Sequence, residues 1–317
     1  MWRVTADNKN ETGAVAVIVA ILLVVLLGFV ALAVDVGVIS SERAQLQNGA
    51  DAAAIGIAQE CARSTTSTVP SPLCSTTSTL ATDLANRNAL DGKSTVRSTD
   101  LSTPGKVTVT TVSKEDGAPA DSVSLYFARA LGINSAKPMT RSSAQWGTPT
   151  KGPAILPLAV AACKFDIPHD GLRGTLQVLE QGKGCGSVPG GFGWLPPNPG
   201  TCTIVVGTSS EWFGVNTGAS APTSCSAADF SKVNNKTVLL PVYDLASGTG
   251  KNAAYYIKGF AAFHVTGYQF ANIGWTAGPT VDNKSITGYF EKFVSLDQAF
   301  ELGSSPYFGA SVVRPIL

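Results

Sequence analysis

The side chains that most often carry catalysis or bind metals are few and scattered in this chain. There are two histidines: His169 lies in the turn-like stretch DIPHDG, and His264 lies in an aromatic-rich stretch where we expect a hydrogen-bonded sheet residue. Asp166 and Asp170 flank the first histidine and could bind a cation weakly, although solvated turn acids are the simpler interpretation. The chain has no H-E-x-x-H, G-x-S-x-G, S-x-x-K, P-loop or G-x-G-x-x-G motif. We therefore predict a non-enzyme without catalytic residues, cofactor or metal.

Two other features have a superficial likeness to ligand sites. Gly248–Lys251 lies in the stretch DLASGTGKN, but this stretch lacks the residue order of a phosphate-binding loop. The regions around Trp194, Trp212 and Trp275 could stack against sugar rings, although core packing is the more common use of tryptophan. A membrane-anchored extracytoplasmic hydrolase would need an acid pair or a Ser/His pair in a cleft of residues 151–317, and the sequence offers little for it.

Composition limits the class of protein. The 317 residues carry a net charge of +1 and only 14% of them are charged, so we expect no nucleic-acid partner. The length allows two domains. With 32 glycines and 18 prolines, a turn-rich β structure is favoured over helices after about residue 100.

Residues 14–34 form an uninterrupted apolar segment, AVAVIVAILLVVLLGFVALAV, without a charged or polar side chain. A helix with a rise of about 1.5 Å per residue would cover ~30 Å here, the thickness of the hydrocarbon core of a bilayer. A cleaved signal peptide is the main alternative, but the flank VDVGVISS is a weak cleavage site and the helical pattern continues through it. We predict a retained transmembrane helix over 13–39, in contact with membrane lipid.

The orientation of this helix is predicted from the cysteines. Lysine and arginine are nearly balanced on its two sides, because Arg3 and Lys9 precede it and Arg43 and Arg63 follow it. All six cysteines follow the apolar segment, and an even number of scattered cysteines favours disulfides in an oxidising compartment. We therefore expect residues 1–12 in the cytoplasm and the remainder outside the cell membrane.

The candidate disulfide cysteines are Cys61, Cys74, Cys163, Cys185, Cys202 and Cys225. None of them forms a C-x-x-C pair. Cys61 and Cys74 are the favoured pair, because the Ser/Thr/Pro-rich segment between them could loop back. Cys185 and Cys202 could staple the Gly/Pro-rich segment that they enclose. Alternatives are a different order that includes the other two cysteines, and buried free thiols.

Beyond Asp35 the apolar segment changes into an amphipathic helix. Apolar residues recur at spacings of three and four, with one arginine among them, which predicts an interaction face along the helix. This face comprises Val36, Ile39, Arg43, Leu46, Ala50, Ala53, Ile57 and Cys61. Gly49 and Gly56 each cost the helix about 1 kcal/mol relative to alanine, which indicates close approach of another element. One helix would thus leave the membrane and continue as the spine of a folded domain.

Three stretches of this helix carry a family resemblance: GAVAV (13–17), LLGFVALAVDVG (26–37) and ERAQLQNGADAAA (42–54). Together they resemble the N-terminal domain of the TadE/TadG-like family of Flp (tight adherence) pilus assembly proteins, firmly over 13–63 and more loosely as far as Trp146. The resemblance implies a single-pass membrane protein for assembly or anchoring of Flp-type pili. Its partners would be the Tad pilus assembly machinery or other pilin-like subunits.

The resemblance also raises the question of processing. Type IV-like prepilins are cut after a glycine and carry glutamate at the fifth mature position, which places a candidate cleavage between Gly13 and Ala14. The fifth residue after that glycine is Ile18, so a permanently anchored protein is favoured. Some members carry a von Willebrand type A domain with a D-x-S-x-S metal site. Asp244 and Ser247 have the wrong spacing for it, so we predict neither that domain nor its metal.

The whole sequence predicts an α+β fold, in which a long transmembrane-plus-amphipathic helix packs on a small antiparallel sheet and a mainly β C-terminal domain follows. A pilin-like α+β module is expected over 40–146, a Gly/Pro linker over 147–153 and the β domain over 154–317. The expected elements are a helix at 80–90, strands at 106–114, 201–207, 236–244, 253–270 and 285–294, and strand–turn–strand at 122–146. The alternative function is an adhesin whose β domain binds a surface polysaccharide or a host ligand through exposed aromatic residues.

Overall fold

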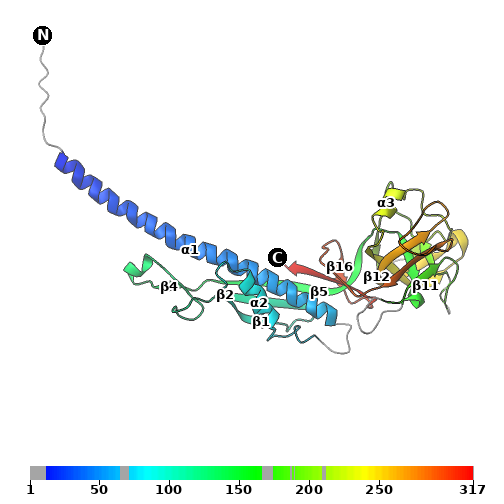
Figure 1. The fold of residues 1–317 in the computed structure, drawn as a ribbon, viewed down its shortest axis with the longest axis horizontal. Helices are drawn as coiled ribbons and strands as arrows, with labels where there is room; N and C mark the ends of the chain where they lie inside the picture. Colours follow the sequence, from blue (N-terminus) through cyan, green and yellow to red (C-terminus); the bar gives the residue numbers. More distant parts are fainter. Residues whose placement is uncertain are drawn as a thin grey trace, which may run out of the picture. The chain divides into compact units, whose positions relative to one another are not determined.

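The computed structural model describes residues 12–64, 71–165, 174–185, 188, 190–208 and 212–316. It has one long N-terminal helix followed by a mainly β remainder, which confirms the predicted fold class (Figure 1). The predicted cytoplasmic tail 1–12 lies almost entirely outside the described residues.

Helix α1 (Thr12–Ser64) is unbroken through its apolar and amphipathic parts (Figure 1). No proline occurs within it, and its apolar part is rich in leucine and alanine, which favour helix. Its last turn is closed by local bonds: Arg63 pairs with Glu60 at 3.0 Å, and the Ser64 hydroxyl donates to the Glu60 carbonyl at 2.8 Å.

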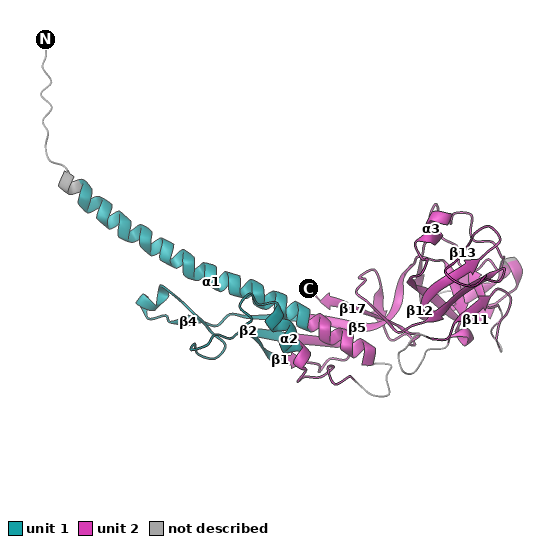
Figure 2. Cartoon of the chain, in the orientation of Figure 1, with its two compact units in different colours: residues 1–53, 81–98, 109–142 teal, residues 54–80, 99–108, 143–317 magenta. Residues whose placement is uncertain are grey.

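The chain forms two compact units, which Figure 2 colours separately. The first unit comprises residues 1–53, 81–98 and 109–142, and the second comprises 54–80, 99–108 and 143–317. Helix α1 passes from the first to the second after Ala53. The predicted boundaries at 40–146 and 154–317 remain predictions.

In the first unit, the described part of α1 packs with a short helix and with strands. The predicted helix 80–90 is α2 (Thr79–Arg87), which buries Ala81 and Ala85. The predicted strand 106–114 is β2 (Lys106–Ser113), and its β-branched residues are mostly buried. The remaining elements that begin in this unit are β1 (Ser94–Asp100), β3 (Val123–Ser124), η1 (Ala128–Leu131), β4 (Ser135–Ala136) and β5 (Met139–Ala154). The 3-10 helix η1 ends at Leu131, and its C-cap residue Gly132 has a left-handed φ of 82°.

The residues predicted to form a linker, 147–153, are instead part of the continuous strand β5. Gly152 is present for packing, because the ring of Phe300 occupies the space that a Cβ atom would need. Pro149 lies opposite Leu302, directly beside the register shift in the neighbouring strand between Glu301 and Leu302. The expectation of an irregular linker is therefore wrong.

Strand β5 lies at the centre of a seven-stranded sheet with the order β1-β2-β5-β17-β15, to which β9 and β16 add on β5. The strands that complete it are β9 (Ile204–Gly207), β15 (Phe293–Ser295), β16 (Glu301–Gly303) and β17 (Ala310–Ile316). The predicted strand 201–207 is thus the shorter β9. The C-terminal strand β17 was not predicted, and it pairs antiparallel with β5.

A second sheet of eight strands belongs wholly to the second unit and has the order β7-β14-β12-β11-β6-β8, with β10 and β13 on β12. Its strands are β6 (Leu158–Ala161), β7 (Gln177–Glu180), β8 (Phe192–Trp194), β10 (Trp212–Gly214), β11 (Thr237–Ser247), β12 (Ala254–Gln269), β13 (Gly274–Thr276) and β14 (Ser285–Phe290). All pairs are antiparallel except β11 with β6. The predicted strand 285–294 is two strands, β14 and β15, which belong to different sheets. Three short helices accompany this sheet: η2 (Ala162–Lys164), α3 (Ala227–Ser231) and η3 (Gly250–Asn252).

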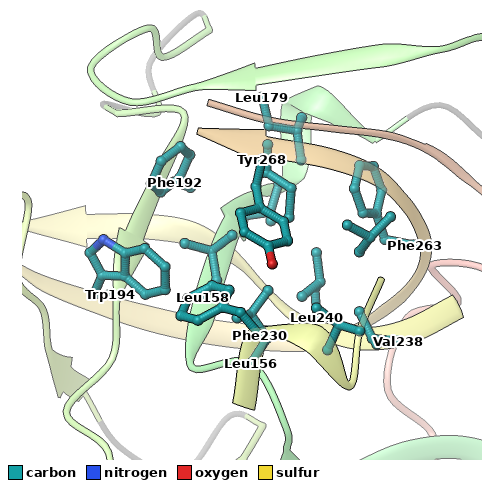
Figure 3. Packing of buried hydrophobic residues seen from close by; sticks show 14 of the residues in the cluster. Leu156, Leu158, Leu179, Phe192, Trp194, Phe230, Val238, Leu240, Phe263 and Tyr268 are labelled. Atoms are coloured by element: carbon teal, nitrogen blue, oxygen red, sulfur yellow. The ribbon is translucent and has the colours of Figure 1, made fainter. Parts of the chain in front are cut away.

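The core of the second unit is aromatic. Trp194 is 1% exposed, and its ring makes edge contacts with Phe270 at 4.9 Å and with Phe230 at 6.1 Å between centroids. Figure 3 shows Trp194, Phe192 and Phe230 among leucine and valine side chains of this cluster. On β12, one face is apolar and fully buried, and it comprises Ile257, Gly259, Ala261, Phe263 and Val265.

Three disulfides join the six cysteines. Cys61–Cys74 is confirmed, with the Cα atoms 4.8 Å apart. For the other four cysteines, the candidate Cys185–Cys202 pair is not formed, and the structure has the alternative order: Cys163 is joined to Cys185 and Cys202 to Cys225. The reason is burial: Cys202 and Cys225 both lie in the aromatic core, whereas Cys163 is exposed and Cys185 is half-buried.

Alkaline pH is expected to destabilise the second unit. Tyr243 and Tyr255 are buried and stacked, with ring centroids 3.7 Å apart. Burial raises the pKa of both phenols, so the folded chain retains protons that the unfolded chain releases. Such stability is complete below the unfolded pKa of about 10 and is lost as the pH rises above it. The urea midpoint of the full chain in detergent should therefore fall above about pH 10.

The matched control is the double variant Tyr243→Phe/Tyr255→Phe. It starts from a lower midpoint, since Tyr243 loses the hydrogen bond that it donates to the Gly190 carbonyl at 3.0 Å. Its midpoint should then fall less with rising pH than that of the unmodified chain. An equal fall in both proteins would assign the alkaline loss to other groups.

Candidate membrane and assembly interface

The apolar part of α1 is exposed along its described length. The segment Val15–Ser64 is long and apolar enough to cross a membrane, and its most apolar stretch has a mean hydropathy of 3.4 with none of it buried in the protein. Side chains from Val15 to Val34 are mostly 42–68% exposed. Transfer of such a surface from water into lipid is strongly favourable. This one N-terminal helix could span a membrane.

The predicted interaction face of α1 divides into two parts. Leu46, Ala50, Ala53 and Ile57 are completely buried within the protein, together with Cys61. Val36 and Arg43 are exposed, and Ile39 is half-buried. Only the part of the face nearest the apolar segment is thus available to a partner, and the remainder forms the core. That the exposed part contacts pilus subunits remains a prediction.

The buried part of α1 is fixed by close packing and by hydrogen bonds. A Cβ atom on Gly49 would lie 3.2 Å from both the Cα and the carbonyl oxygen of Ala85 on α2. The small-residue pattern around Gly49 therefore serves close approach of α2. On the neighbouring strand, the Thr111 hydroxyl lies 2.8 Å from the Leu46 carbonyl, to which it donates, and 2.8 Å from the Thr140 hydroxyl.

A buried carboxylate stands where the apolar part of α1 ends. Asp35 is 3% exposed and accepts hydrogen bonds from three consecutive backbone N–H groups. Oδ1 accepts from Tyr126 at 2.8 Å, and Oδ2 accepts from Phe127 at 3.1 Å and from Ala128 at 2.6 Å. Phe127 is the N-cap residue of η1 and provides no side-chain cap. Asp35 therefore caps η1 from a distant element, which satisfies amides that would otherwise be costly to bury.

A groove of about 550 Å³ lies beside this cap. One wall comes from residues 27–35 of α1 and the other from residues 127–131, in and next to η1. Its side chains are apolar except for Asp35, whose oxygens are already occupied. The sequence reasoning missed this site, although a lone acid directly after an apolar segment is a signal for it.

The residues considered for chemistry do not form a catalytic site in the described part of the chain. His264 Nδ1 lies 3.1 Å from the Thr237 hydroxyl and Nε2 lies 3.1 Å from Asn235 Oδ1, as expected of a hydrogen-bonded sheet residue. Asp244 accepts a 2.5 Å bond from Lys258. Asp166, His169 and Asp170 lie outside the described residues. Among the residues that are described, no group of three His, Cys, Asp or Glu side chains could hold a metal ion.

The three tryptophan regions do not form one stacking surface. Trp194 is in the core, Trp275 is half-buried, and Trp212 is 48% exposed. Trp212 lies against Tyr256, with ring centroids 5.6 Å apart. The core-packing interpretation therefore holds for Trp194, and only Trp212 is freely available to a ligand.

These features define a candidate membrane-anchored protein whose apolar helix continues into a folded domain. Residues 13–59 match the family described as "Putative Flp pilus-assembly TadE/G-like", which confirms the family resemblance of this N-terminal segment. No curated protein and no solved structure matches the chain. The family match and the candidate membrane helix together fit a Tad pilus-associated membrane protein, a class that suggests a non-catalytic role.

Proposed function

We propose that this chain takes part in the assembly or anchoring of Flp/Tad-type pili and acts through the surface of α1 rather than by catalysis. The observation that carries the proposal is the family match over 13–59, on a helix with an exposed apolar part and a buried second part. The N-terminus lies in the cytoplasm and the β domain outside the membrane. The three disulfides support this orientation, since they persist in oxidising compartments.

Pilus assembly in cells that lack the chain tests this function. The cells receive either the unmodified chain or a chain whose residues 13–39 are replaced by an unrelated single membrane span. Only the unmodified chain should restore surface pili, although both chains should fractionate with the membrane. Restoration by both chains would show that residues 13–39 of α1 act only as a membrane anchor. Piliation without either chain would overturn the proposed function.

The mature chain is expected to retain the residues that precede Ala14. Ile18 occupies the position at which prepilins carry glutamate, so a prepilin peptidase should not cut after Gly13. Intact-mass measurement of the protein from its native membrane checks this expectation. An Ile18→Glu variant serves as the comparison, because it restores the missing acid and should become the better substrate. A native chain that begins at Ala14 would contradict the fixed anchor and make the protein a pilin-like subunit.

A second candidate function is ligand binding by the β domain. Trp212 is exposed beside Tyr256, and Gly214 on the same strand lines a groove of about 570 Å³ that also contains Pro197 and Asn216. An exposed aromatic pair of this kind suits a polysaccharide. Loss of polysaccharide binding in Trp212→Ala, but not in Trp275→Ala, would support an adhesin.

A further inference from the structure

We infer that the segment Tyr126–Ile133, here called the exit loop, is a second membrane contact that lies in the lipid beside α1. The partner is a phospholipid, with acyl chain against the groove and headgroup near the loop's polar atoms. This inference rests on the proposed membrane position of α1, and it adds a site on a different part of the chain.

The exit loop exposes more apolar surface than a water-facing loop of its size needs. Its large apolar side chains point away from the core of their unit: Leu131 is 83% exposed, Tyr126 67%, Ile133 55% and Phe127 49%. Of these, Phe127 and Leu131 line the groove together with exposed apolar residues of α1. Contiguous exposed apolar surface of this kind marks an interaction site.

The depth of the exit loop follows from its neighbours on α1. The groove joins the loop to residues 27–35, which cover about 12 Å along the helix at a rise of about 1.5 Å per residue. The apolar segment from Val15 to Asp35 covers ~30 Å, so the loop lies beside roughly its last two-fifths. If α1 spans the bilayer, the loop is at the depth of the outer hydrocarbon and headgroup region.

Most backbone N–H groups of the exit loop have hydrogen-bond acceptors within the protein and so do not need water. In lipid, each peptide N–H must find a partner within the protein, because lipid supplies none. Asp35 accepts from three of these groups, and backbone carbonyls accept from most of the others. The N–H groups with such acceptors are those of Leu125, Tyr126, Phe127, Ala128, Ala130, Gly132 and Ile133. The Asp35 cap thus lowers the free-energy cost of placing a non-regular loop at the edge of the hydrocarbon region.

The polar atoms of the exit loop also suit a bilayer surface. Tyr126 is an aromatic residue of the type enriched where hydrocarbon meets headgroups, and Phe127 is of the type favoured in the hydrocarbon itself. Arg129 is exposed, and its Nε donates to the Leu125 carbonyl at 3.3 Å, which leaves the other guanidinium donors for a phosphate. The groove is continuous with the unburied apolar stretch of α1 that is proposed to lie in the bilayer, so lipid is the favoured occupant.

Photo-crosslinking in the native membrane tests the inference on the full chain. The photoreactive amino acid p-benzoyl-phenylalanine replaces one of three exposed leucines: Leu131 in the exit loop, Leu23 within α1, or Leu90 after α2, which are 83%, 52% and 90% exposed. After illumination, mass spectrometry separates phospholipid adducts from protein adducts. We expect lipid adducts at Leu131 and Leu23, and at least several-fold fewer at Leu90.

The three positions separate the possible failures. Lipid adducts at Leu23 without lipid adducts at Leu131 would overturn the exit-loop inference and leave the membrane span intact. Protein adducts at Leu131 in place of lipid would also overturn it and would indicate a docked subunit. Absence of lipid at Leu23 would overturn the span itself and, with it, the proposed membrane function.

Discussion

Replacement of Asp35 by asparagine is expected to release the exit loop from α1 while the rest of the fold persists. The side chain keeps its size but loses its charge and one acceptor oxygen, so it can no longer accept from Tyr126, Phe127 and Ala128 together. Hydrogen bonds to a carboxylate are about twice as strong as those to a neutral group. Amide hydrogen exchange in peptides covering 125–133 should therefore accelerate several-fold, as measured by mass spectrometry in detergent.

The matched control is Asp51→Asn on the same helix. Asp51 is half-buried and accepts one side-chain bond, from Gln47 at 2.9 Å. Its replacement should leave exchange over 125–133 unchanged. If the two variants exchange alike, the Asp35 cap does not hold the loop. Asp35→Asn is also expected to lower lipid crosslinking from Leu131, since an uncapped loop with free amides would leave the hydrocarbon.

Helix α1 could be predicted from the sequence because the residue pattern that defines it is contiguous in the chain. Twenty-one consecutive apolar residues, followed by a change to amphipathic periodicity, indicate both where the exposed apolar part lies and where packing within the protein begins. The buried residues Leu46, Ala50, Ala53 and Ile57 all lie on the predicted face. The strands β2, β11 and β12 were found for the same reason, because β-branched and aromatic residues concentrate there.

The Asp35 cap could not be derived in this way. Its partner amides lie 91 to 93 residues along the chain, and backbone amides carry no side-chain signature. The sequence did mark Asp35 as the end of the apolar segment. The sequence did not show that Asp35 accepts hydrogen bonds from these amides, because that role depends on η1 being folded against α1.

The errors at 147–153 and at the disulfides have a common physical cause. Both predictions assigned roles to glycine, proline and cysteine from the neighbouring sequence alone. In the structure, Gly152 makes room for Phe300, and Cys202 pairs with Cys225 because both enter the same core. Tertiary packing therefore decided the role of these residues, and one sequence alone does not reveal it.

Replacement of Gly49 by leucine is expected to destabilise the first unit, whereas the same replacement at Gly37 is expected to stabilise it slightly. A Cβ on Gly49 would already lie 3.2 Å from two backbone atoms of Ala85, so a whole leucine must push α2 away. Such overpacking costs ~1–3 kcal/mol. Leucine regains somewhat less than about 1 kcal/mol of helix propensity relative to glycine. The overpacking exceeds this gain, and the net effect should be a loss of up to ~2 kcal/mol.

Gly37 makes this comparison informative, because no atom lies within 4 Å of the position that its Cβ would occupy. Leucine there should yield only the propensity gain. Thermal unfolding of both full-length variants in detergent measures the difference, for which each 1 kcal/mol corresponds to about 2–4 °C. Gly49→Ala should be close to neutral, since the helix gain of about 1 kcal/mol offsets a contact too short by a few tenths of an ångström. If Gly49→Leu melts as high as Gly37→Leu, α2 does not pack against α1 at this glycine, and the helix is held to its unit by other contacts.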